Sequence, residues 1–181
     1  MKRLFLSLLA LVGAIGLQAQ PTSVPEGGFG GFQLPEIKME YSKKYENVDY
    51  AGDGQVYHQM DVYLPKEEKS SYPVVVHIYG SAWYSNNSKG MADLGTICQA
   101  LLDAGYAVVT PNHRSSSDAL FPGAINDIKA VVRYIRANAS EYGFDPSFVA
   151  VSGFSSGGHL ASLAATSGDV AELEGTVGGN L

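Results

Sequence analysis

Cysteine is almost missing from this sequence, because Cys98 is the only one among 181 residues. A single cysteine excludes an internal disulfide, and none stands near the N-terminus where a lipid anchor would be attached. Cys98 lies among Leu94, Ile97, Leu101 and Leu102 at helical spacing. We therefore expect its thiol to fill a core and not to act as a nucleophile.

Positive charge is also scarce, with 12 Lys and Arg against 18 Asp and Glu and a net charge of −6. No basic stripe offsets this balance, so nucleic acid and anionic membranes are not expected as partners. No His, Cys, Asp or Glu residues cluster at metal-ligand spacing, and no glycine-rich phosphate loop follows a strand. We expect no metal and no cofactor.

A hydrophobic run long enough to cross a membrane is absent as well. The longest, from Leu4 to Leu17, is nearly unbroken over 14 residues (17 − 4 + 1), whereas a spanning helix needs roughly 20. Lys2 and Arg3 precede this run and Ala19 follows it, which predicts a secretory signal peptide over residues 1–19. A buried N-terminal helix is the alternative. The mature protein is expected to be exported and to have no membrane anchor.

Strand and helix patterns alternate along the rest of the chain. Residues 20–36 are rich in proline and glycine, which predicts a flexible linker. The whole sequence is 45% apolar, enough for one globular core, and we expect residues 37–181 to form a single domain. The alternation predicts an α/β fold whose mostly parallel sheet follows an antiparallel hairpin. The expected strands cover residues 45–50, 55–64, 74–79, 106–110 and 147–152, and the expected helices cover 91–104, 124–139 and 159–165.

One motif carries chemistry, the run Gly153-Phe154-Ser155-Ser156-Gly157, which follows a predicted strand and opens a predicted helix. This is a G-x-S-x-G nucleophile elbow, in which a serine hydroxyl is exposed on a sharp turn. The glycines at 153 and 157 let the strand and the helix approach each other. Ser155 is the candidate nucleophile, and a glycine-rich turn without chemistry is the alternative.

Further motifs stand in the order that a known family uses. Tyr79-Gly80-Ser81-Ala82-Trp83 follows the third strand, and the segments 111–115 and 121–129 are similar to that family's Asp-Tyr-Arg and Phe-Pro-Ala-Ala-x-x-Asp block. From about residue 60 to 165 the chain resembles the hormone-sensitive-lipase-like branch of the α/β-hydrolases. Within that branch it is similar to secreted bacterial carbohydrate acetyl- and feruloyl-type esterases.

This resemblance implies an oxyanion hole made by the backbone N–H groups of Ser81, Ala82 and Ser156, with Gly80 and Trp83 beside it. The family usually has a histidine at the position of Tyr79, and this chain has His77 on the same strand face instead. Backbone donors tolerate the loss of the family's glycines if φ stays negative. Arg114 and Asp127 are expected to form a structural ion pair near the site.

The other members of a catalytic triad are missing after the serine. In this fold the order is Ser, Asp or Glu, then His, yet the last histidine is His159, one helical turn beyond Ser155. His159 is a weak alternative as base, and Asp169, Glu172 and Glu174 read as a solvated helix face. We therefore expect the triad acid and histidine to lie beyond residue 181, so that the chain is the N-terminal portion of a hydrolase truncated after the elbow strand and helix.

Taken alone, such a portion is expected to be inactive and to expose the strand at 148–151 as an apolar edge. The resemblance implies a serine esterase that forms an acyl-serine intermediate on acetyl or aromatic acyl esters of carbohydrates, either small molecules or polysaccharide-linked. One alternative is a non-catalytic protein of the same fold. A serine peptidase of the dipeptidyl or prolyl type is another, although such enzymes usually carry a large extra domain before the elbow.

Overall fold

The structure is a computed structural model and describes residues 38–180. The predicted signal peptide at 1–19, the whole of the linker at 20–36 and the first residue of the predicted domain at 37–181 lie outside this range, and the signal peptide and the linker remain predictions. Within residues 38–180, no helix is both long and apolar enough to cross a membrane.

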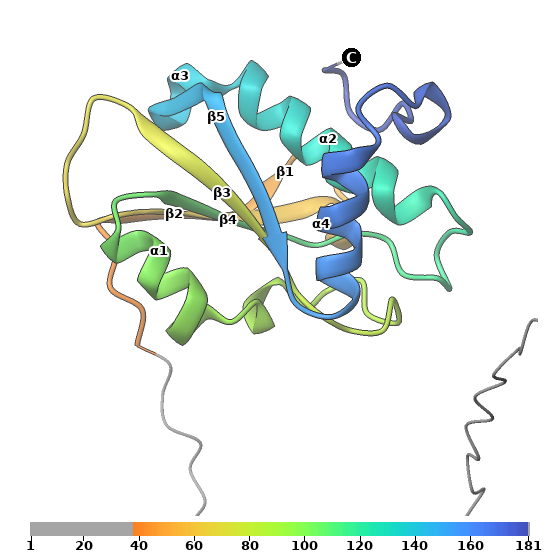
Figure 1. Cartoon of the computed structure of the whole chain (residues 1–181), viewed down its shortest axis with the longest axis horizontal. Helices are drawn as coiled ribbons and strands as arrows, with labels where there is room; N and C mark the ends of the chain where they lie inside the picture. Colours follow the sequence, from red (N-terminus) through yellow and green to blue (C-terminus); the bar gives the residue numbers. More distant parts are fainter. Residues whose placement is uncertain (1–37, 181) are drawn as a thin grey trace, which may run out of the picture. The chain divides into compact units, whose positions relative to one another are not determined.

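A single mixed sheet organises the domain, with the strand order β1-β2-β4-β3-β5 (Figure 1). The two N-terminal strands form an antiparallel hairpin, β2 also pairs antiparallel with β4, and β3 pairs parallel with both β4 and β5. The predicted α/β-hydrolase architecture is confirmed. The strands are β1 (Lys43–Asp49), β2 (Gln59–Leu64), β3 (Tyr72–Ile78), β4 (Ala107–Pro111) and β5 (Phe144–Gly153).

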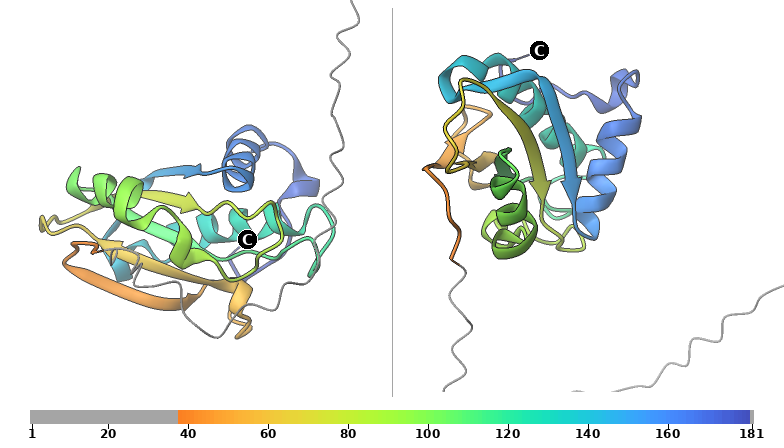
Figure 2. Two further views of the ribbon diagram at one scale, coloured as in Figure 1. Left: turned by 90° about the horizontal axis from the view of Figure 1, so that it is seen from below. Right: turned by 60° about the vertical axis from the view of Figure 1, so that its left-hand side comes forward.

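Helices lie on both faces of the sheet (Figure 2). The α-helices are α1 (Gln99–Asp103), α2 (Gly123–Ala137), α3 (Ala139–Tyr142) and α4 (Ser156–Thr166), and the shorter turns are η1 (Val56–His58), η2 (Lys89–Met91), η3 (Leu94–Cys98) and η4 (Ala171–Leu173). Helices α2 and α4 cover one face, and α1 covers the other.

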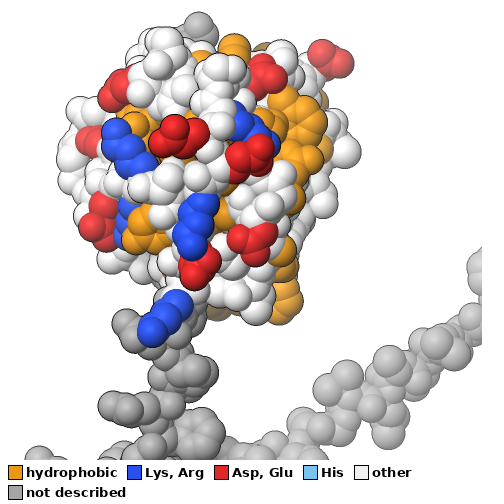
Figure 3. All heavy atoms as spheres, turned by 90° about the vertical axis from the view of Figure 1, so that its left-hand side faces the viewer, with side chains coloured by type: hydrophobic (Ala, Val, Ile, Leu, Met, Phe, Trp, Pro, Cys, Tyr) orange, Lys and Arg blue, Asp and Glu red, His pale blue; other side chains and the backbone are white. Residues whose placement is uncertain are grey.

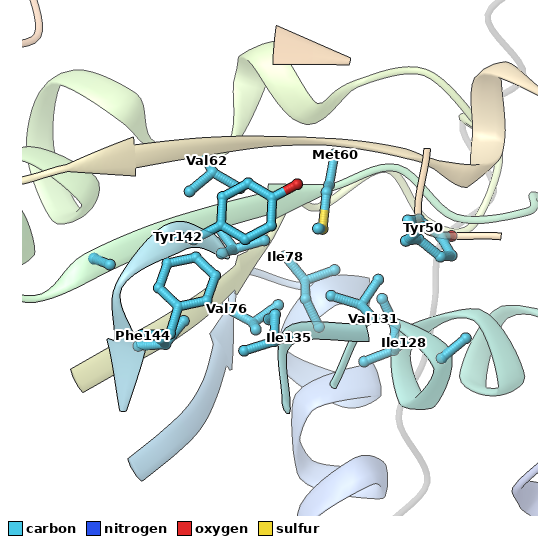
Figure 4. Packing of buried hydrophobic residues seen from close by; sticks show 14 of the residues in the cluster. Tyr50, Met60, Val62, Val76, Ile78, Ile128, Val131, Ile135, Tyr142 and Phe144 are labelled. Carbon is cyan, nitrogen blue, oxygen red and sulfur yellow. The ribbon is translucent and has the colours of Figure 1, made fainter. Parts of the chain in front are cut away.

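The main core lies between the sheet and α2. Val76 and Ile78 of β3 pack with Ile128, Val131 and Ile135 of α2, and all five are buried (Figure 4). In α2 these apolar residues recur every three or four positions, so one side of the helix faces the sheet. This packing holds the carboxyl end of β3, and with it the loop that follows, in a fixed place beside β5.

The predicted helix at 91–104 is wrong in its first half. Asp93 takes a left-handed φ of 50°, and the chain forms the 3₁₀ turn η2 before it and the π-helical turn η3 after it. The Asp93 carboxylate lies 3.0 Å from Nε2 of His77 on β3, and this contact fixes the residue outside the helix. Cys98 is fully buried as predicted, and burial raises the pKa of its thiol to about 12.

Strand β5 is the edge of the described sheet and hydrogen-bonds only to β3 within it. It begins at Phe144, earlier than predicted, because Phe144 already pairs with Tyr72 at the start of β3. Phe148 on this strand is 44% exposed, as expected for the uncovered edge at 148–151.

On the face drawn in Figure 3, acidic and basic side chains are interspersed around small apolar patches.

Candidate active site

Ser155 occupies the turn between β5 and α4 in an unusual backbone conformation, with φ 52° and ψ −119°. A non-glycine residue rarely adopts this conformation, and it persists only where the surrounding structure enforces it. Its side chain is exposed. The strain and the exposure are those of a nucleophile elbow.

The elbow and the loop after β3 are in direct contact. A Cβ at Gly80 would lie 2.8 Å from the carbonyl oxygen of Phe154 and 2.9 Å from Cβ of Ser155, and a Cβ at Gly153 would lie 2.5 Å from the backbone of Gly157. The Phe154 N–H also donates to the carbonyl of Ile78 at 3.1 Å. Only glycine fits at these positions, so the structure brings the two sequence motifs together.

The loop carries two of the three backbone donors that the resemblance implies. Ala82 and Trp83 have φ values of 48° and 61°, which corrects the assumption that φ stays negative there. The N–H of Ser81 donates to Oγ of Ser156 at 2.9 Å. Ser156 is the first residue of α4, so its own N–H has no partner within the helix and points out of a positive helix end.

Arg114 and Asp127 form the ion pair that the sequence predicts. The Arg114 Nη2 lies 2.6 Å and Nε 3.0 Å from Oδ1 of Asp127, which is fully buried, and the Arg114 backbone N–H donates to Oδ2 at 2.8 Å. His58 completes this cluster, with Nε2 3.2 Å from Asp127 and Nδ1 2.7 Å from Asp53. No hydrogen bond or ion pair joins Arg114, Asp127 or His58 to Ser155. The cluster therefore stabilises the fold near the site.

Sequence reasoning missed the role of His58, which it assigned to a strand. The residue lies in the 3₁₀ turn η1 and joins the first turn of the domain to α2, across 69 residues. No local pattern signals a contact between residues so far apart.

The other three histidines have contacts of their own. His77 lies 2.8 Å from Oγ of Ser152 and 3.0 Å from Asp93, so its two ring nitrogens contact β5 and the residue before η3. His113 is fully buried and stacks on Tyr79, with ring centroids 4.9 Å apart, and burial lowers its pKa. His159 is exposed and meets Trp83 edge-on at 5.3 Å.

A cavity of about 230 Å³ opens beside the elbow. Its lining is mostly apolar and comes from four segments: the loop after β3, the loop that leads into α2, the first turn of α2, and α4. The sequence did not predict the contribution of the loop that leads into α2, because nothing local marks residues 115–121 as lining a cavity. The main lining side chains are Trp83, Phe121, Ile125, His159, Leu160 and Leu163.

The acidic residues after the elbow behave in two ways. Asp169 and Glu172 are exposed as predicted. Glu174 is instead paired with Lys129 and Arg133 of α2, so it belongs to an ion cluster and not to a solvated face. Within residues 38–180 no group of three or more His, Cys, Asp or Glu side chains could hold a metal ion.

Comparison with known proteins identifies the family of this chain. The BD-FAE family profile matches residues 60–181, well over half of the chain. The chain belongs to the BD-FAE family. Among curated relatives, "Probable carboxylic ester hydrolase LipM" of Mycobacterium tuberculosis is 35% identical over 126 residues, and "Carboxylesterase NlhH" of the same organism is 31% identical over 147.

Solved structures place this BD-FAE member among esterases. A "truncated form of carbohydrate esterase from gut microbiota" is 48% identical with a TM-score of 0.72 and covers 77% of this chain. A bifunctional GH43-CE protein of Bacteroides eggerthii is 51% identical with the same TM-score over 76% of this chain. The predicted membership in the hormone-sensitive-lipase-like esterase branch is confirmed.

The BD-FAE chain is shorter than these relatives. It spans 29% of LipM, 41% of NlhH, 52% of the truncated carbohydrate esterase and 20% of the bifunctional protein. The two curated matches include 65% and 81% of this chain, respectively. The region that the family profile matches, residues 60–181, contains both the loop after β3 and the elbow.

Proposed function

We propose that this BD-FAE chain carries the nucleophile and the oxyanion hole of a carboxylic ester hydrolase that works through an acyl-serine intermediate. The observation that supports this most is the strained, exposed Ser155 packed against the loop that begins at Gly80. A strained serine beside free backbone N–H groups is the arrangement that acyl transfer requires.

In the proposed reaction, Ser155 Oγ attacks the ester carbonyl carbon while a general base takes its proton. The carbonyl oxygen becomes negatively charged and accepts hydrogen bonds from the N–H groups of Ser156 and Ala82, at the positive end of α4. The C–O bond to the alcohol then breaks as the alcohol oxygen receives that proton. Water, deprotonated by the same base, hydrolyses the acyl-serine.

None of the four histidines suits the role of base. Three are buried, with His58 and His77 held between polar partners and His113 stacked on Tyr79, and the exposed His159 contacts Trp83. A triad base must reach the serine hydroxyl and be oriented by a carboxylate. We propose that base and acid come from residues outside this chain, and that the 181 residues alone are inactive.

For the substrate we propose acetyl or aromatic acyl esters of carbohydrates, either small or linked to a polysaccharide. Two lines support this class: the carbohydrate esterases at 48% and 51% identity, and the apolar cavity between Trp83 and Leu163, which suits an acyl group beside the reacting carbonyl. The leader pattern at residues 1–19 supports a proposal that the protein is exported.

The test is an ester-hydrolysis assay on the full-length gene product with 4-nitrophenyl acetate and an acetylated xylo-oligosaccharide. Ser155→Ala should lower turnover by about 10⁶. The matched control is Ser162→Ala in α4, the helix that follows Ser155, because Ser162 is exposed and its hydroxyl donates only to the carbonyl of Gly158. Undiminished hydrolysis by Ser155→Ala, or no hydrolysis by a folded wild-type protein, would refute the proposal.

A further inference from the structure

The residue after the proposed nucleophile has a side chain that bonds to the oxyanion loop. Oγ of Ser156 accepts the Ser81 N–H at 2.9 Å, across 75 residues of sequence, and Ser156 is only 2% exposed. Ser81 itself is half-buried, so its N–H is bonded to a hydroxyl that is almost completely removed from solvent. This contact is therefore the polar link between the helix end and the loop.

Ser81 is the anchor of the loop. Its carbonyl accepts the N–H of Tyr84 at 2.9 Å, and its Oγ accepts the N–H of Ser85 at 3.3 Å. The far end of the loop is held separately, by the Lys89 ammonium group 2.6 Å from the buried carboxylate of Asp61. The N–H, the carbonyl oxygen and Oγ of Ser81 therefore each form a hydrogen bond.

The two residues after Ser81 need this anchor. Ala82 and Trp83 both have left-handed φ values, 48° and 61°, which are sterically unfavourable for residues with a Cβ. A strained pair of this kind keeps its geometry only where neighbouring contacts over-determine it. If the Gly80–Ser81 peptide were released from Ser156, the next peptide, which carries the Ala82 N–H, would be held only through its carbonyl by the Tyr84 N–H and would tilt away from its present orientation.

We propose that Ser156 is a positioning residue for ester hydrolysis: its hydroxyl holds the Gly80–Ser81 peptide, and this keeps the next peptide oriented so that the Ala82 N–H faces the oxyanion. The inference rests on the proposed function and deepens it. It assigns the Ser81 N–H to the scaffold, leaving two backbone donors, those of Ala82 and Ser156. Ser156 then contributes to the oxyanion hole in two ways: its backbone N–H is one donor, and its side chain positions the other donor, the Ala82 N–H.

The first experiment compares Ser156→Ala with Ser156→Thr in the full-length gene product. Alanine removes the acceptor and threonine keeps it. For 4-nitrophenyl acetate we expect Ser156→Ala to lower kcat by about 10²-fold, the usual effect of a donor displaced by about 1 Å, with KM changed less than about threefold. Ser156→Thr should recover most of that loss. Wild-type kcat in Ser156→Ala, or an equal loss in both variants, would overturn the proposal.

The second experiment does not depend on ester turnover. Amide hydrogen exchange of the Ser81 N–H should become at least about tenfold faster in Ser156→Ala, because its acceptor is gone. The Phe154 N–H, which donates to the Ile78 carbonyl in the same region, is the internal control and should not change. Equal acceleration at both amides, or none at Ser81, would overturn the positioning role even if the esterase assignment failed for other reasons. Ser156→Cys, which keeps the volume but accepts weakly, repeats the test if the alanine variant does not fold.

Discussion

Gly157 lies directly against the end of strand β3: a Cβ at this position would be 2.2 Å from the carbonyl oxygen of Ile78 and 2.5 Å from that of Tyr79. Both oxygens belong to the backbone, so neither can move without displacing the strand. The contact sets the distance between the helix that follows the elbow and the loop for which we propose the oxyanion donors. It makes the glycine at 157 a requirement of packing as well as of the sequence motif.

Gly157→Ala is therefore expected to lower the free energy of unfolding by more than about 2 kcal/mol, because overpacking against backbone cannot be relieved by a change of rotamer. Urea unfolding measures the effect. The matched control is Gly168→Ala, where an added Cβ would meet nothing within 4 Å, and its midpoint should stay close to that of the wild type. Equal midpoints for the two variants would contradict the packing argument.

Ala82→Gly tests the left-handed conformation of the oxyanion loop. Glycine adopts a φ of 48° without the steric cost that alanine pays. The relief is partly offset by the extra freedom of glycine in the unfolded chain, so stability should be unchanged or raised by up to about 1 kcal/mol. Thermal unfolding of the variant gives the answer.

The control for Ala82→Gly is Ala165→Gly, at an exposed position within α4. That change should cost about 1 kcal/mol, the usual penalty for glycine inside a helix. If both substitutions destabilise the protein equally, Ala82 does not adopt a left-handed conformation.

His58 predicts a pH dependence of stability. Burial opposes its charge, but hydrogen bonds to Asp127 and Asp53 outweigh burial and raise its pKa above the ordinary 6.5. A pKa that is higher in the folded state adds stability that is fully present below pH 6.5 and is lost as pH rises through the folded value. We expect the free energy of unfolding to fall over that window.

His58→Gln should flatten this part of the pH profile, as measured by urea unfolding at a series of pH values from about 5.5 to 9. Asp53→Asn removes one of the two carboxylates and should flatten it in part. Parallel profiles for the wild type and His58→Gln would show that the Asp53, His58 and Asp127 cluster does not titrate in this range.

Much of the fold could be predicted from local patterns. The β-branched run that became β3 and the helical spacing of Ile128, Val131 and Ile135 both marked their elements, and the elbow glycines marked the turn. These signals are local, because each depends on residues a few positions apart.

The features that the sequence did not predict depend on contacts between residues far apart in the chain. The helix predicted from residue 91 is broken at Asp93 by its contact with His77, 16 residues earlier. The left-handed φ of Ala82 and the bond between Ser81 and Ser156 are set by the approach of the elbow, 75 residues later. Hydrophobic spacing contains no information about such hydrogen bonds.

The central claim is that Ser155 is the nucleophile, and covalent labelling tests it most directly. The full-length gene product is treated with an aryl phosphonate ester, which forms a stable adduct with an activated serine, and peptide fragmentation in a mass spectrometer locates the adduct. If Ser155 is the nucleophile, one adduct forms, on Ser155, hydrolysis of 4-nitrophenyl acetate is lost in proportion to labelling, and Ser155→Ala forms no adduct. An adduct on Ser156 or another residue, or hydrolysis that continues after complete labelling of Ser155, would contradict it.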